Sequence, residues 1–135
     1  MDAVRLFSII SWISLPTVMF GGYSLLRLLA SGDKMLTPFR ETYFRAGHAH
    51  AGVLLVLSLL YYSYLAQTTF SGSLKLVACI VLVIGILAQS GGFFLHMGIG
   101  KPGRISAGNI VTSVGALLLA FVVLLLAYGL IFAHV

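Results

Sequence analysis

Long, uninterrupted runs of apolar residues dominate the chain. Four of these runs, at about 6–30, 46–66, 74–97 and 107–133, are long enough for helices that cross a bilayer, which takes roughly 20 residues. Short segments that hold most of the charged residues separate the runs. The pattern predicts an all-α integral membrane protein, a four-helix antiparallel bundle that occupies residues 1–135 as a single transmembrane domain.

The composition supports a membrane protein. Of the 135 residues, 60% are hydrophobic and 8% are charged, whereas soluble domains carry about 25% charged residues. This argues against a soluble enzyme, a disordered regulator and a nucleic-acid-binding module. The formal net charge of +5 does not indicate nucleic acid, because basic residues scattered between apolar runs usually mark the cytoplasmic ends of membrane helices.

The basic residues are distributed unevenly between the two ends of the predicted bundle. The end with the connections 31–45 and 98–106 holds six of them, and only Arg5 and Lys75 fall at the other end. The six are Arg27, Lys34, Arg40, Arg45, Lys101 and Arg104. The positive-inside rule then predicts that both connections face the cytoplasm and that both termini lie on the outer side. Tyr61, Tyr62 and Tyr64 are expected to form an aromatic belt at the outer interface.

Two short patterns recur and suggest that the bundle consists of two related helical hairpins. Residues 45–48 read Arg-Ala-Gly-His and residues 106–109 read Ser-Ala-Gly-Asn, each at the start of an even-numbered run. Gly21-Gly22 near the end of the first run is echoed by Gly91-Gly92 near the end of the third. In a true duplication, Asn109 would take the place of His48. The alternative is chance, because such pairs are common in apolar sequence.

Three histidines are the most informative polar residues. The second run begins His48-Ala49-His50 and the third ends near His96. Because antiparallel neighbours bring the start of one helix beside the end of the other, we expect His48 or His50 to approach His96 at the cytoplasmic rim. Ionisable residues within membrane spans are costly and are candidates for function.

The spacing of the first two histidines restricts the kind of site that they can form. Residues at i and i+2 of an α-helix point about 200° apart, so His48 and His50 cannot both bind one ion from a regular helix. The inward one could pair with His96 around a haem iron, or supply part of a copper, zinc or iron site. A structural polar cluster, and substrate binding or proton transfer without metal, are the alternatives.

Four further polar residues are expected around the histidines. Gln89 and Asn109 are predicted to be hydrogen-bond partners that fix the tautomer of a ligating histidine. Glu41 and Arg45, in the polar connection before the histidine pair, would lie at the mouth of the site, where they could also form an ordinary i, i+4 surface pair.

The run Phe-Arg-Ala-Gly-His-Ala-His-Ala-Gly at residues 44–52 resembles one found in small four-span bacterial membrane proteins of unassigned function. The length of the chain and its number of spans also agree with those proteins. The resemblance implies that the protein lies in a bacterial plasma membrane. More distantly, the His-x-His is similar to the haem-ligating helix of the haem-copper oxidase catalytic subunit family. The chain lacks that family's eight further spans and its later histidine cluster. The likeness implies haem or metal on His48 or His50, with His96 as second ligand.

The resulting functional hypothesis is a membrane protein that binds haem or a transition metal and acts in electron transfer, sensing or cofactor handling. One alternative is a small oligomeric transporter or channel. Another is a membrane-embedded enzyme on an apolar or lipid substrate, with the three histidines and Glu41 as acid and base. A third is an accessory subunit of a larger membrane complex. The expected partners are the lipid bilayer and either further copies of the chain or that larger complex.

Overall fold

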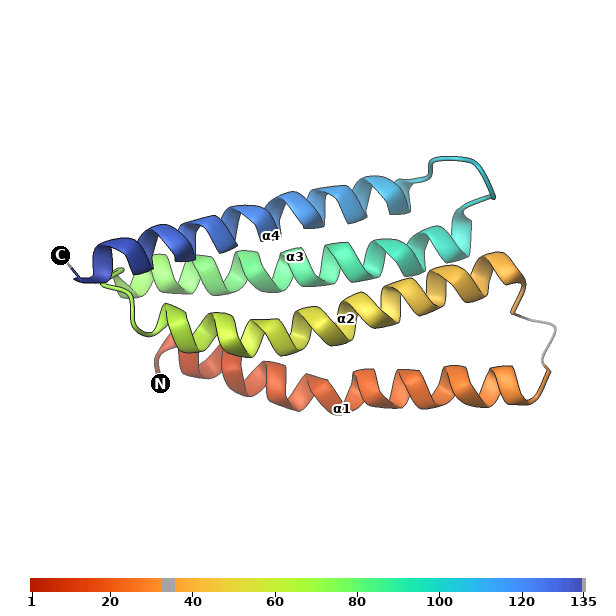
Figure 1. Ribbon diagram of the computed structural model, residues 1–135, viewed down its shortest axis with the longest axis horizontal. Helices are drawn as coiled ribbons and strands as arrows, with labels where there is room; N and C mark the ends of the chain where they lie inside the picture. The colour runs from red at the N-terminus through yellow and green to blue at the C-terminus, as the bar shows by residue number, and fades with distance from the viewer. Residues whose placement is uncertain (33–35, 135) are drawn as a thin grey trace.

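The computed structural model describes residues 1–32 and 36–134. Within them it has four α-helices, followed by a short 3-10 turn, η1. The elements are α1 (Ala3–Ala30), α2 (Pro38–Leu65), α3 (Gly72–Ile99), α4 (Ala107–Ile131) and η1 (Phe132–His134). Each α-helix is long and apolar enough to cross a membrane. Consecutive helices run antiparallel (Figure 1), so the predicted all-α, four-helix architecture is confirmed.

Both termini lie at one end of the bundle, which we call the terminal end (Figure 1). The opposite end holds the connection 100–106 and is called the loop end. The two termini therefore share one end of the bundle, as expected. Which side of the membrane this end faces stays a prediction. Lys34, one of the basic residues used for that prediction, lies outside the described residues.

The start of α2 differs from the sequence-based expectation. The helix begins at Pro38 rather than near residue 46, with Thr37 as its N-cap. The Thr37 side chain accepts a hydrogen bond from the backbone N–H of Arg40, and proline at the first helical position has no N–H to satisfy. A search for apolar runs misses this polar beginning. As a result, the two histidines at 48 and 50 lie about three turns inside the helix, not in its first turn.

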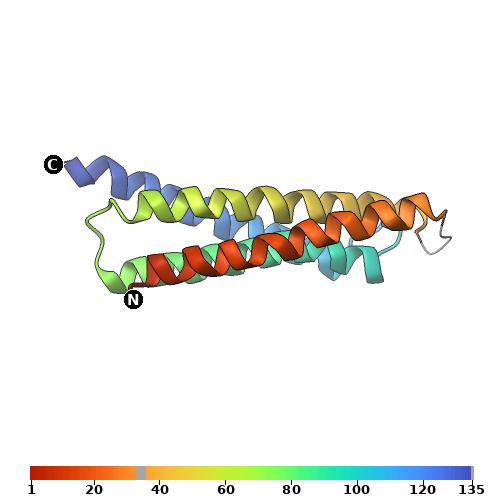
Figure 2. The ribbon, with the colours of Figure 1, turned by 90° about the horizontal axis from the view of Figure 1, so that it is seen from below.

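The helices pack in a zigzag rather than a closed square. α2 and α3 form the central pair, α1 packs against both, and α4 packs against both. Within the described residues, α1 and α4 have no contact with each other. Figures 1 and 2 show them at the two outer positions of the row. Much of α1 is therefore left uncovered by the rest of the chain.

The closest packing joins α3 to α4 along a seam of small residues spaced by seven. This glycine seam consists of Gly85, Gly92, Gly108 and Gly115. A Cβ atom on Gly92 would overlap the Thr112 hydroxyl, and one on Gly115 would overlap the backbone nitrogen of Gln89. In lipid, where helices gain little from burying apolar surface, such small residues allow the close backbone approach that holds two helices together.

The predicted belt of tyrosines is wrong for two of its three members. Tyr61 and Tyr62 are 5% and 0% exposed and belong to the core with Cys79 and Val122. The Tyr61 hydroxyl donates a hydrogen bond to the Val122 carbonyl at 3.2 Å. Only Tyr64 is half exposed. Successive residues of an α-helix point about 100° apart, so three tyrosines at 61, 62 and 64 cannot share one lipid-facing side.

The two hairpins place their glycine pairs in related positions. Gly22 of α1 lies against the His48 ring of α2, and Gly92 of α3 lies against Gly108 and Thr112 of α4. The first residues of the two pairs differ in their surroundings. A Cβ on Gly21 would contact the His48 ring, whereas a Cβ on Gly91 would meet open space. Sequence duplication of the hairpins stays a prediction.

Candidate functional site

His96 is buried at the loop end, where it links three segments of the chain. Its side chain is 2% exposed, and its Nδ1 lies 2.7 Å from the Ser106 hydroxyl oxygen. The rings of Phe39 and Tyr43, in the first turns of α2, pack on it with centroid distances of 5.4 and 4.3 Å. His96 therefore holds the end of α3 against the starts of both α2 and α4.

Ser106 is the direct partner of His96, and it was not among the residues predicted from the sequence. It is the N-cap of α4, where its hydroxyl oxygen accepts a hydrogen bond from the Gly108 N–H at 3.1 Å. The Asn109 side-chain oxygen in turn accepts from the Ser106 N–H at 2.8 Å. The spacing Ser-x-x-Asn before an apolar run is a capping pattern related to the capping box, and it is the signal that could have revealed this residue.

Asn109 and Gln89 play different parts from those predicted. Asn109 acts on His96 only through Ser106, because its side-chain oxygen is hydrogen-bonded to the serine backbone. The backbone of Gln89 lies against Gly115, and its carbonyl accepts a hydrogen bond from Thr112 at 3.4 Å. Gln89 therefore belongs to the packing of α3 on α4, and no hydrogen bond joins it to a histidine among the described residues.

His50 has one ring nitrogen engaged, and its other ring nitrogen has no hydrogen bond to the described residues. Its Nδ1 lies 2.8 Å from the Ala46 carbonyl oxygen. Because a carbonyl can only accept, Nδ1 carries the proton, and in a neutral imidazole Nε2 then keeps its lone pair. The Phe93 ring of α3 packs on the imidazole at a centroid distance of 4.7 Å. This arrangement prepares Nε2 to accept a proton or to ligate a metal.

His50 lines a lateral cavity of about 160 Å³ together with Ala49, Val53 and Leu54. A second cavity of about 330 Å³ lies between α2 and α4 and shares Leu54 with the first. No polar surface lines this second cavity. Together the two cavities form what we call the lateral groove, an apolar strip with His50 at the end nearer the loops.

His48 points to a different neighbour, the first helix. A Cβ on Gly22 would lie 2.8 Å from its Nε2, and one on Gly21 would lie 3.5 Å from its Nδ1. Phe44, one turn earlier on α2, has its ring centroid 6.4 Å from that of the imidazole. The glycine pair thus makes room for this ring, and the imidazole itself fills the space between the two helices.

The expected approach of His48 or His50 to His96 is not observed. The ring neighbours of His96 are Phe39 and Tyr43, and Tyr43 precedes His50 by about 10 Å of helix rise. The reason is the early start of α2, since its first turns, rather than the histidines, face the end of α3. Across the described residues, no group of three or more His, Cys, Asp or Glu side chains could hold a metal ion.

Glu41 and Arg45 form an ion pair on α2. The Arg45 guanidinium lies 2.6 Å from a carboxylate oxygen of Glu41, in the i, i+4 arrangement. The Arg45 side chain is 60% exposed, and pairs of this kind contribute little to stability. Neither residue is hydrogen-bonded to a histidine in the described part of the chain, so the pair belongs to the surface of α2.

Comparison of the chain with protein-family models, curated proteins and solved structures found no match. The chemistry of the site is therefore argued from its own residues. They offer one imidazole, His50, whose Nδ1 is held by a backbone carbonyl and which lines a lateral cavity, and one buried imidazole, His96, tied to a helix cap.

Proposed function

We propose that the protein is an integral membrane protein that binds haem, with His50 as the axial ligand, and that it acts in electron transfer, sensing or cofactor handling. One observation carries the proposal. The Nδ1 of His50 is committed to the Ala46 carbonyl, and the residue lines a small cavity with Ala49, Val53 and Leu54. A hydrogen bond from the second ring nitrogen to a backbone carbonyl is the usual support of a ligating histidine.

The set of available ligands favours haem over a bare ion. A structural or catalytic zinc needs three or four protein ligands, and the described residues offer no such group. The porphyrin supplies four nitrogens itself, so one histidine is enough to hold haem iron. Because His48 and His96 lie in other helix contacts, we expect one axial histidine from each chain.

The surroundings of His50 suit a flat apolar group. The two cavities of the lateral groove share Leu54 and have largely apolar walls, and Ala49, with its small side chain, lines the first cavity together with His50. Burial of apolar surface in such a groove would stabilise a bound macrocycle. Phe93, whose ring packs at a tilt on the imidazole, would hold it in place.

The test is a visible absorption spectrum of the full chain, purified in detergent after expression with added haem precursor. We expect a Soret band with about one haem per chain, of the high-spin type that a single histidine ligand produces. His50→Ala should lose the band, whereas the matched variant His48→Ala, two residues away on the same helix, should keep it. Colourless, folded protein, or a band that survives His50→Ala, would contradict the proposal.

A second candidate function rests on the groove itself. Its apolar lining also fits the hydrocarbon tail of a lipid-like substrate, with Nε2 of His50 as a general base. Colourless protein that copurifies with such a lipid, and loses it in His50→Ala, would favour this candidate over haem. A role as an oligomeric transporter, or as an accessory subunit, has no specific observation in its favour.

A further inference from the structure

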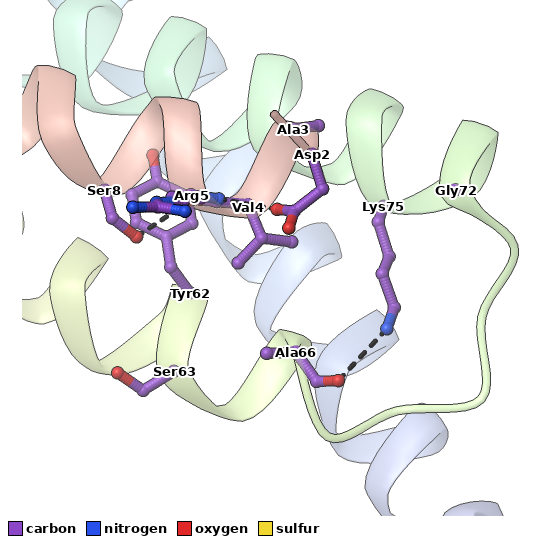
Figure 3. Close-up of a pocket in the computed structure, with 10 residues that line it drawn as sticks. All are labelled: Asp2, Ala3, Val4, Arg5, Ser8, Tyr62, Ser63, Ala66, Gly72 and Lys75. Atoms are coloured by element: carbon purple, nitrogen blue, oxygen red, sulfur yellow. Dashed lines mark hydrogen bonds between the residues drawn. The ribbon is translucent and has the colours of Figure 1, made fainter.

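A cavity of about 450 Å³ lies at the terminal end of the bundle (Figure 3). It is far along the bundle from His48, His50 and His96. The start of α1, the end of α2 and the start of α3 surround it. Asp2 and Arg5 come from the first segment and Lys75 from the third, while the buried Tyr62 contributes from the second. The cavity is independent of the lateral groove and of the proposed haem.

The charged side chains of the terminal end all line this cavity. They are Asp2, Arg5 and Lys75, and every other charged side chain in the sequence belongs to segments that lead to the loop end. Charged groups at the end of a membrane bundle could have pointed anywhere around its rim. Instead, all three line one cavity, which therefore has two cationic side chains and one carboxylate.

The two cations keep hydrogen-bond donors available. The Arg5 guanidinium has no hydrogen bond or ion pair with the described residues. The Lys75 ammonium donates to the Ala66 carbonyl at 3.1 Å, which leaves two of its three N–H groups free. Arginine and lysine with free donors are the residues that bind phosphate.

The two serine hydroxyls of the cavity cannot replace these donors, and the Tyr62 hydroxyl, which has no hydrogen-bond partner among the described residues, is buried away from solvent. The Ser8 and Ser63 hydroxyls already donate to the carbonyls of Val4 and Leu59, at 2.8 and 3.0 Å. They can still accept hydrogen bonds, but an anion needs donors. The cationic side chains must therefore supply most of the hydrogen bonds to any anion in this cavity.

Two helix N-termini add to the positive potential. α1 begins at Ala3 and α3 begins at Gly72, and residues at both starts line the cavity. The partial positive charge of a helix N-terminus favours a nearby anion. The Asp2 carboxylate caps α1 by accepting the Arg5 N–H at 2.8 Å, which leaves it able to attract a cation as well.

We propose that this cavity binds the phosphate group of a phospholipid, with Arg5 and Lys75 as donors. The ends of membrane-spanning helices lie at headgroup depth, and the apolar side chains of Val4 and Ala66 offer a surface for the upper acyl chain. The Asp2 carboxylate can accept hydrogen bonds from the ammonium group of an ethanolamine headgroup. Phosphatidylethanolamine, which carries both charges, therefore matches the cavity better than phosphatidylglycerol.

The test uses native mass spectrometry of the full chain, purified and depleted of lipid in detergent. The ligands are phosphatidylethanolamine, phosphatidylglycerol, diacylglycerol with the same acyl chains, and inorganic phosphate. We expect a phosphatidylethanolamine adduct that the double variant Arg5→Gln/Lys75→Gln weakens roughly a hundredfold, about tenfold for each of the two charge-assisted hydrogen bonds lost. The matched variant Lys101→Gln/Arg104→Gln, at the loop end, should keep the adduct.

Two further variants separate charge from folding. Asp2→Asn keeps a good N-cap and should reduce the preference for phosphatidylethanolamine over phosphatidylglycerol. Arg5→Gln alone removes no side-chain hydrogen bond or ion pair within the described protein, so a loss of lipid binding with an unchanged unfolding midpoint is an effect on the lipid site and not on folding. Equal binding of diacylglycerol, or lipid binding unchanged in Arg5→Gln, would overturn the proposal. Displacement of the lipid by inorganic phosphate would assign the cavity to a soluble phosphate instead.

Discussion

Ser106 connects the end of one helix to the start of the next through a single oxygen. Its hydroxyl caps α4 at the Gly108 N–H and contacts the Nδ1 of the buried His96. Ser106→Ala removes the cap and leaves an imidazole nitrogen without a partner. We expect the free energy of unfolding to fall by about 1–3 kcal/mol, measured as a lower thermal or detergent-induced unfolding midpoint of the purified protein.

Ser113→Ala is the matched control for that change. Ser113 also lies on α4, but it is exposed and its hydroxyl donates to the Asn109 carbonyl of its own helix at 3.0 Å. We expect its removal to change the free energy of unfolding by less than about 0.5 kcal/mol. Equal effects of the two substitutions would show that the link from Ser106 to His96 contributes nothing beyond an ordinary serine.

At the scale of single residues, the sequence predicted which side chains are special better than it predicted their contacts. His96 was expected near the end of its helix, and it lies there, with its side chain buried. Its partner could not be found by matching histidines, because the contact is made by Ser106 across a connection. The sequence also could not decide which of His48 and His50 faces the bundle, because that depends on the neighbouring helices. In the structure His48 contacts α1 and His50 contacts α3.

Adjacent glycines at the end of α3 give a direct test of the glycine seam. A Cβ on Gly92 would overlap the Thr112 hydroxyl and the Gly108 backbone, whereas one on Gly91 would meet open space. Gly92→Ala must push α3 and α4 apart, and we expect a loss of about 1–3 kcal/mol in the free energy of unfolding. Gly91→Ala should be neutral or slightly stabilising, because alanine has the higher helix propensity.

The same unfolding measurement, made on both glycine variants in one detergent, decides the matter. If Gly91→Ala destabilises as much as Gly92→Ala, the close contact between α3 and α4 is not what holds this pair together. If neither variant changes the midpoint, the seam tolerates an added methyl group and the two helices can separate without loss.

At the scale of helices, apolar length predicted the existence of all four but not every boundary. α3 and α4 begin within two residues of the expected positions, because their apolar runs start close to the caps Ser71 and Ser106. α2 begins much earlier because Thr37 and Pro38 start a helix whose first turns are polar. A capping signal, read together with hydropathy, would have found that start.

At the scale of the whole molecule, the sequence could predict antiparallel neighbours but not the zigzag. Short connections fix which helices are adjacent along the chain, yet they do not decide which diagonal pairs touch. That choice depends on side-chain size. Small residues draw α4 onto α3, while aromatic rings such as Tyr43 and Phe93 pack between α2 and α3. The outer helices are left without contact with each other in the described structure.

The orientation of the whole bundle can be tested with the cysteine chemistry of the chain itself. Cys79 is 0% exposed, so the parent protein should not react with a membrane-impermeant maleimide. Thr69→Cys adds an exposed thiol between α2 and α3 at the terminal end, and Ile105→Cys adds one at the loop end, where Ile105 is 84% exposed. Because the basic residues concentrate at the loop end, the positive-inside rule places that end in the cytoplasm. Intact cells should therefore label Thr69→Cys at once and Ile105→Cys only after permeabilisation, and the reverse order would invert the topology.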